Sequence, residues 1–109
     1  MMGSVWEVIA YDGRRVRLTE SQKRHISFFH PEALVREERL KETLAKPDLV
    51  VRGGQSTTRV LYRHYEATPV TSKHLAVVVR ALNGEGFIVT SYFTDKVRRT
   101  GVVWKKTDS

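Results

Sequence analysis

LAVVVRALNGEGFIVTSYFT, residues 75–94, is the stretch that decides the fold of this chain. Two apolar runs, Leu75–Leu82 and Phe87–Phe93, flank the sequence Asn83-Gly84-Glu85-Gly86, whose residue types favour a tight turn. Apolar runs of this length that are bounded by a turn are typical of buried strands. We therefore expect an antiparallel hairpin, with Leu75–Leu82 as a central strand of a sheet.

The second strand of this hairpin changes character along its length. It begins with apolar residues, continues with four hydroxyl groups in five residues, and is followed by a cationic run. Buried hydroxyls cost free energy unless they have hydrogen-bond partners, whereas a phosphate-binding surface needs both hydroxyls and cations. Alternation along a strand predicts Ile88, Thr90 and Tyr92 on one face and Ser91 on the other.

Thr90 and Tyr92 are therefore candidates for one site, close to the point where Lys96, Arg98 and Arg99 follow the strand. Strand formation alone would also explain the first two residues, because Thr suits strands and Tyr suits cross-strand pairs. The functional interpretation rests on the whole run of hydroxyls and cations rather than on any one of them.

Outward from the hairpin, local signals predict two helices and further strands. Thr19 and Gln22 form a capping-box pattern that predicts the start of a short helix, which Pro31 ends. The other expected elements are a hairpin around Asp12-Gly13, a second helix over 32–45, and strands over Leu49–Arg52, Thr58–Tyr65 and Gly101–Trp104.

These elements predict an α+β fold with two N-terminal helices packed on a four-stranded, or slightly larger, antiparallel sheet. The chain has 109 residues and 40% hydrophobic residues, which suits one core and one domain over 1–109. We expect the N-terminal hairpin within 1–18, the helices within 19–46 and the sheet within 47–104.

Charge is distributed unevenly along the chain. The formal net charge is +7. Residues 1–48 hold nine Lys/Arg and eight Asp/Glu, whereas residues 49–109 hold ten Lys/Arg and four Asp/Glu. A basic excess of this kind favours polyanionic partners, RNA or DNA first, although it also fits a basic domain without such a partner.

Several functional classes lack their motifs. The chain contains no GxxxxGK[ST], GxGxxG or GxSxG sequence, and it has no cysteine to act as a nucleophile or to form a disulfide. We expect no cofactor and no metal, because His25 and His30 do not have a recognised ligand spacing. We also expect a reducing cytosol as the location, with no signal peptide and no membrane-spanning segment.

Metal-independent cleavage of RNA fits the remaining side chains. The reaction needs a base near the attacking 2′-hydroxyl, an acid near the leaving oxygen, and cations or donors on the phosphoryl oxygens. His25, on the first helix, is the leading acid or base, although packing against its aromatic neighbours would explain it equally well. His64 alternates with Arg63 on its strand, so we expect these two side chains on opposite faces.

The order of segments resembles the phage-type branch of the barnase/EndoU/colicin/RelE-like (BECR) nuclease superfamily over residues 22–104. The segments that carry the resemblance are Arg24-His25-Ile26, His30-Pro31-Glu32, Thr43-Leu44-x-x-Pro47-Asp48, Arg59–Tyr65, Leu75–Val79 and Phe87–Lys96. The resemblance implies a small α+β domain with helices on a four-stranded antiparallel sheet. It also implies a metal-independent ribonuclease that acts as a toxin, phage-borne effector or processing enzyme.

Carried over residue by residue, the resemblance implies catalytic roles for His25, Arg63, Thr90 and Tyr92. It places Lys96 beside them, and His64 is a second candidate on the Arg63 strand. We expect Lys96, Arg98, Arg99 and His64 to contact nucleic acid.

Two further hypotheses remain open. One is a basic module that binds RNA or DNA without cleaving it, with tyrosines as stacking platforms. The other is a domain whose basic face docks an acidic antitoxin or immunity protein.

Overall fold

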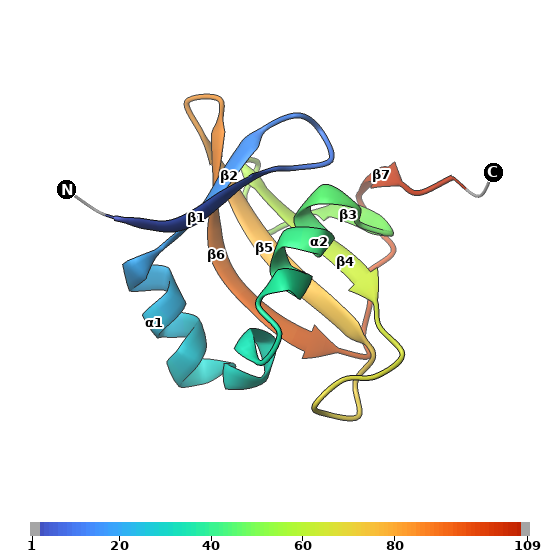
Figure 1. Cartoon of the computed structure of the whole chain (residues 1–109). Coiled ribbons are helices and arrows are strands. Elements are labelled where there is room, and N and C mark those ends of the chain that lie inside the picture. The colour runs from blue at the N-terminus through green and yellow to red at the C-terminus, as the bar shows by residue number, and fades with distance from the viewer. Residues whose placement is uncertain (1–2, 108–109) are drawn as a thin grey trace.

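Within residues 3–107, which the computed structural model describes, seven strands form one sheet and two α-helices and a 3-10 helix cover one of its faces (Figure 1). The elements in chain order are β1 (Ser4–Ile9), β2 (Arg15–Thr19), α1 (Glu20–Phe29), the 3-10 helix η1 (Pro31–Leu34), α2 (Glu38–Ala45), β3 (Leu49–Arg52), β4 (Thr58–His64), β5 (His74–Leu82), β6 (Glu85–Thr94) and β7 (Val102–Lys105). None of these helices is long and apolar enough to cross a membrane.

The α+β class is confirmed, but the expected four-stranded antiparallel sheet is too small. The strand order is β1-β2-β6-β5-β4-β3-β7, and the sheet is mixed because β2 pairs with β6 in parallel while the other pairs are antiparallel. Gly86 faces Val16 in this parallel pair, and a Cβ at Gly86 would lie 2.9 Å from Val16 Cγ2. The glycine therefore permits the close approach that joins the N-terminal hairpin to the sheet.

The hairpin over residues 75–94 forms as predicted, with a two-residue turn. Asn83 and Gly84 both have positive φ, 53° and 80°, as a type I′ turn requires. A register shift follows, in which Val89 of β6 is the extra residue, because Val78 pairs with Thr90 while Val79 pairs with Ile88. The predicted face of Ile88 is therefore wrong: the extra residue turns Ile88 toward the helices, whereas Thr90 faces the other way.

Helix α1 begins as the sequence predicts. Thr19 Oγ1 accepts a hydrogen bond from the Gln22 backbone N–H at 3.2 Å, and the Gln22 side chain donates to the Val89 carbonyl at 2.6 Å. The continuous helix expected over 32–45 is wrong, because a 3-10 turn and a break precede α2. Glu37 at this break forms a partly exposed ion pair with Lys23 of α1 at 3.1 Å.

The two faces of the sheet have different cores. The face under α1 and α2, called the helix face, holds the larger cluster, which includes Leu61, Leu75 and Val77. The opposite face, called the open face, holds a smaller cluster of Leu49, Val51, Val60, Tyr62 and Ala76, with Val78, Tyr92 and Val97 packed against it. The connection over 95–101 links β6 to β7 across β5, β4 and β3, and its Val97 packs on the open face.

Candidate nucleic-acid interface

The sheet separates two of the side chains that were predicted to share a phosphate. Arg63 pairs with Leu75 and has the same parity as Leu61, so it points to the helix face. Thr90 pairs with Val78 and points to the open face. Arg63 and Thr90 therefore do not form one site.

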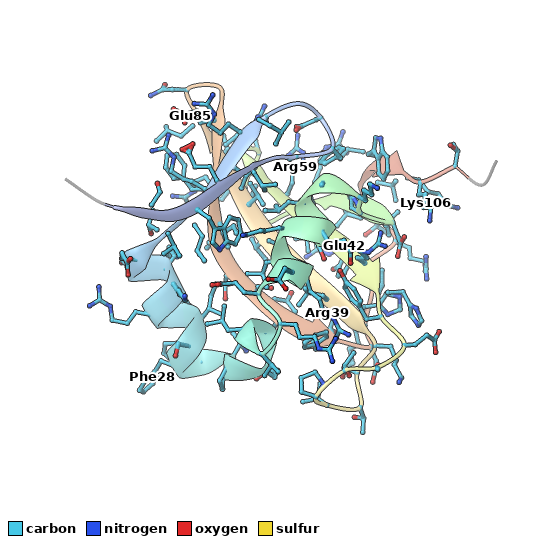
Figure 2. All side chains as sticks on the ribbon, in the orientation of Figure 1. Phe28, Arg39, Glu42, Arg59, Glu85 and Lys106 are labelled. Carbon is cyan, nitrogen blue, oxygen red and sulfur yellow. The ribbon has the colours of Figure 1, made fainter. Side chains whose placement is uncertain are left out.

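Arg63 is engaged in contacts with α2. Its Nη1 donates to the Lys46 carbonyl at 2.6 Å, and its Nε lies 3.4 Å from Glu42 Oε1. The Tyr65 hydroxyl donates to the same carboxylate at 2.6 Å, and burial together with this bond raises the pKa of Tyr65 to about 12. Figure 2 shows Glu42 and Arg39 on the side of the molecule that α2 covers. Arg63 thus fastens the end of β4 to α2.

His25 lies on α1, as predicted, but apart from both of these residues. Its side chain is exposed, whereas the adjacent Ile26 is buried in the helix-face core. The His25 ring lies 4.8 Å from the Phe29 ring, and Phe29 in turn contacts Phe28 with a centroid distance of 4.9 Å. The structure therefore does not bring His25, Arg63 and Thr90 together.

Thr90 and Tyr92 do share the open face. The register aligns Tyr92 with Ala76 and Tyr62 across β6, β5 and β4. Burial raises the pKa of Tyr92. Thr90 Oγ1 is buried and has no hydrogen-bond partner within residues 3–107. The centre of the open face thus combines a buried hydroxyl with two tyrosines.

Two histidines meet at one end of this face. His64 of β4 pairs with His74 of β5, and their ring centroids lie 5.2 Å apart with an interplanar angle of 67°. The His64 backbone N–H donates to Asp48 Oδ2 at 2.8 Å, and His64 Nδ1 lies 3.6 Å from Glu66 Oε1. Carboxylates therefore flank the histidine pair.

Burial lowers the pKa of His74, and the neighbouring His64 lowers it further. Arg99 also lowers this pKa, while Asp48 and Asp95 raise it. The net direction is downward from the usual value of 6.5. His74 is therefore neutral at neutral pH and can accept a proton.

A cationic hollow adjoins the histidine pair. Its volume is about 270 Å³, and it is lined by Asp48, Leu49, Tyr62, His74, Val97, Arg99, Lys105 and Lys106. The Lys106 backbone N–H donates to the Asp48 carbonyl at 3.0 Å, which holds the chain after β7 beside the hollow (Lys106 is labelled in Figure 2). Three cations and one imidazole thus converge on a hollow with a single carboxylate.

The predicted cations over 96–99 reach this side of the sheet through the connection between β6 and β7. The Lys96 backbone N–H donates to Thr94 Oγ1 at 2.9 Å. The Arg98 backbone N–H donates to the Tyr62 hydroxyl at 3.5 Å, and Arg98 Nη1 donates to the Arg52 carbonyl at 3.1 Å. These bonds fix the path of the connection and leave the Lys96 side chain exposed.

Sequence reasoning missed His74, Lys105 and Lys106 as members of this site. All three lie just outside the expected strands, since His74 precedes Leu75–Leu82 and the two lysines follow Gly101–Trp104. One usable signal was present, because His64 lies one residue before the end of the expected strand Thr58–Tyr65 and His74 precedes the next strand. An antiparallel pairing of these neighbouring strands brings the two histidines opposite each other.

No protein-family model, curated protein or solved structure matches the chain. Within residues 3–107, no group of three or more His, Asp or Glu side chains is placed to hold a metal ion. The chemistry of the open face therefore has to be inferred from its own side chains.

Proposed function

We propose that this domain cleaves RNA at the open face, with His64 and His74 as its acid–base pair. The observation that carries the proposal is the 5.2 Å separation of the two rings beside Arg99, Lys105 and Lys106. The proposal retains the metal-independent ribonuclease suggested by the BECR resemblance. It replaces His25, which is exposed on α1, and Arg63, whose guanidinium donates to α2.

The two histidines differ in ways that suit the two proton transfers. His74, with its lowered pKa, is neutral and would remove the proton from the 2′-hydroxyl. The 2′-oxygen would then attack the adjacent phosphorus, and His64 would donate a proton to the departing 5′-oxygen. The products would be a 2′,3′-cyclic phosphate and a 5′-hydroxyl, and the nearby cations would stabilise the charge on the phosphoryl oxygens.

The remainder of the open face supplies features that suit a single strand of RNA. Tyr92 is half-buried on this face, and an aromatic ring of this kind stacks on unpaired bases, whereas its row neighbour Tyr62 is 5% exposed and belongs to the core. Arg98 and Lys96 lie in the connection that crosses this face and would contact the backbone phosphates. The proposed path runs from Tyr92 toward the histidine pair.

Cleavage of a single-stranded RNA in the presence of EDTA tests this proposal. Wild type should cleave the RNA and leave the matching 2′-deoxy strand intact, because the 2′-hydroxyl is the nucleophile. His64→Ala and His74→Ala should each reduce turnover by about 100-fold or more, as expected for loss of a general acid or base. His25→Ala is the matched control and should cleave at the wild-type rate, since that side chain lies on α1.

Equal rates for wild type and His64→Ala would contradict the histidine assignment. A wild-type protein that binds the RNA and its 2′-deoxy counterpart but cleaves neither would support the second candidate function, a binding module without chemistry. Tyr92 favours that candidate, because stacking on its half-buried ring requires neither histidine. An acidic inhibitory protein would compete with RNA for the same cations under either function.

A further inference from the structure

A second hollow lies on the helix face, away from the histidine pair. Its volume is about 520 Å³, and it is lined by Tyr11, Asp12, Arg14, Ser56, Thr57, Arg59, Ala81, Val103 and Trp104. The residues come from the turn between β1 and β2, the loop before β4, the start of β4, the end of β5, and β7. Figure 2 labels Arg59 beside this turn, on the side that faces α2.

Two aromatic rings form one wall of this hollow. The Tyr11 and Trp104 ring centroids lie 5.2 Å apart, with an interplanar angle of 53°. Trp104 pairs with Val50, whose side chain belongs to the helix-face core, so the indole points to that face. The Tyr11 backbone N–H donates to the Leu44 carbonyl at 2.9 Å, which anchors this wall to the end of α2.

Two arginines line the same hollow. Arg59 Nη1 donates to the Ser56 and Thr58 carbonyls, each at 2.9 Å, so the guanidinium is held in place. Arg14 lies in the turn, where its backbone N–H donates to Asp12 Oδ1 at 3.0 Å. Burial and the neighbouring Asp12 raise the pKa of the Tyr11 hydroxyl, while Arg59 and Arg14 lie close enough to oppose this rise in part.

We propose that this hollow binds one nucleotide, with the base against Trp104 and Tyr11 and the phosphate on Arg14 and Arg59. Aromatic rings stack on any base, and a guanidinium binds phosphate through paired hydrogen bonds. The Asp12 carboxylate can accept a hydrogen bond from an exocyclic amino group of the base. The site does not depend on the RNA-cleaving function, because it lies on the other face of the sheet.

The same chemistry would recognise a free nucleoside monophosphate or the 5′-phosphorylated end of an RNA strand. Fluorescence can distinguish these sources, because the chain has two tryptophans and Trp6→Phe leaves Trp104 as the single reporter. The probes are adenosine 5′-monophosphate, adenosine, inorganic phosphate, and a short RNA with or without a 5′-phosphate.

In the Trp6→Phe protein, adenosine 5′-monophosphate should change Trp104 fluorescence with a Kd below about 1 mM. Adenosine and phosphate alone should bind about tenfold more weakly or worse, since each makes only one of the two contacts. Adding Arg14→Gln or Arg59→Gln should weaken binding by about tenfold, because a charge-assisted hydrogen bond is lost. Adding His64→Ala should leave the Kd unchanged.

A response to the 5′-phosphorylated RNA but not to the mononucleotide would assign the site to an RNA end. The proposal would be overturned if neither probe changed Trp104 fluorescence in a protein with a wild-type circular dichroism spectrum. It would equally be overturned if the double variant Arg14→Gln/Arg59→Gln bound both probes as tightly as the Trp6→Phe parent.

Discussion

Arg63 and His64 are adjacent on β4 and lie in contrasting surroundings. Arg63 points to the helix face, where the Lys46 carbonyl and Glu42 of α2 take up its guanidinium. His64 points to the open face, where its ring meets that of His74 next to a cationic hollow. One position therefore joins a strand to a helix, while the next presents an imidazole to solvent.

The difference shows how strand alternation divides structure from candidate chemistry in a small domain. A cation whose donors are taken up by the protein's own carbonyls and carboxylates contributes to stability, but it has fewer donors for a ligand. A half-exposed imidazole beside lysines and an arginine retains its capacity for proton transfer. Stability should therefore depend mainly on the helix face, and nucleic-acid binding on the open face.

The largest expected effect comes from the helix-face core. Leu61 is 2% exposed, and Leu61→Ala should lower the free energy of unfolding by about 3 kcal/mol, because it leaves a cavity beneath the helices. His64→Ala, three positions along the same strand, should change this free energy by less than about 0.5 kcal/mol. Urea denaturation of both variants measures the contrast. Comparable losses would show that the open face also stabilises the fold.

The cations of the hollow should dominate binding of single-stranded RNA. Removing two phosphate contacts with Arg99→Ala/Lys105→Ala should lower the affinity at 0.1 M salt by about 20-fold, because each contact contributes about 0.7 to the slope of log K against log salt. The slope itself should fall by about 1.4. Fluorescence anisotropy over a series of salt concentrations measures both quantities.

Arg24→Ala is the matched control for these cations. Arg24 is exposed on α1, on the far side of the sheet, so its removal should leave the salt slope within error of wild type. An equal fall in slope for Arg24→Ala would show that RNA contacts the helix side as well.

Arg63→Ala should lower stability and leave RNA binding unchanged, which is the reverse of the effect expected for Arg99→Ala/Lys105→Ala. Loss of the bond to the Lys46 carbonyl and of the partly exposed ion pair with Glu42 should cost about 1 kcal/mol of unfolding free energy. RNA affinity and cleavage should stay at wild-type levels, because the side chain does not reach the open face. A loss of cleavage without a loss of stability would restore Arg63 to the catalytic site.

The hairpin, the N-terminal cap and most strands could be predicted, because their signals are local. Asn83-Gly84 suits a turn with two positive φ angles, and Thr19 caps α1 through the Gln22 backbone N–H. The parallel pairing of β2 with β6 could not be predicted, because it joins residues about 70 positions apart and depends on the space at Gly86. The break before α2 likewise could not be predicted, because residues 32–45 are nearly all good helix formers.

The hydroxyl-rich end of β6 was interpreted correctly only in part. Ser91 is buried on the helix face, and its hydroxyl donates to the Ala76 carbonyl at 2.8 Å, so it has a structural partner. Thr94 accepts the Lys96 backbone N–H and shapes the following turn. Alternation assigned Thr90 and Tyr92 to one face, but it could not show that Arg63 and His25 lie elsewhere, because the placement of α1 and α2 is a tertiary property.

The smallest expected effect is the pH dependence that His74 adds to stability. Because the pKa of His74 is lower in the folded protein than the usual 6.5, the unfolded chain binds more protons between the two values. The unfolding free energy should therefore have its full value above pH 6.5 and fall as the pH drops toward the lowered pKa of His74. Below that pKa, His74 should cause no further loss. His74→Gln should flatten this part of the curve of unfolding free energy against pH. His25 is an exposed histidine on α1, so His25→Gln should leave the curve unchanged. If His74→Gln does not flatten the curve, folding leaves the proton affinity of His74 unaltered.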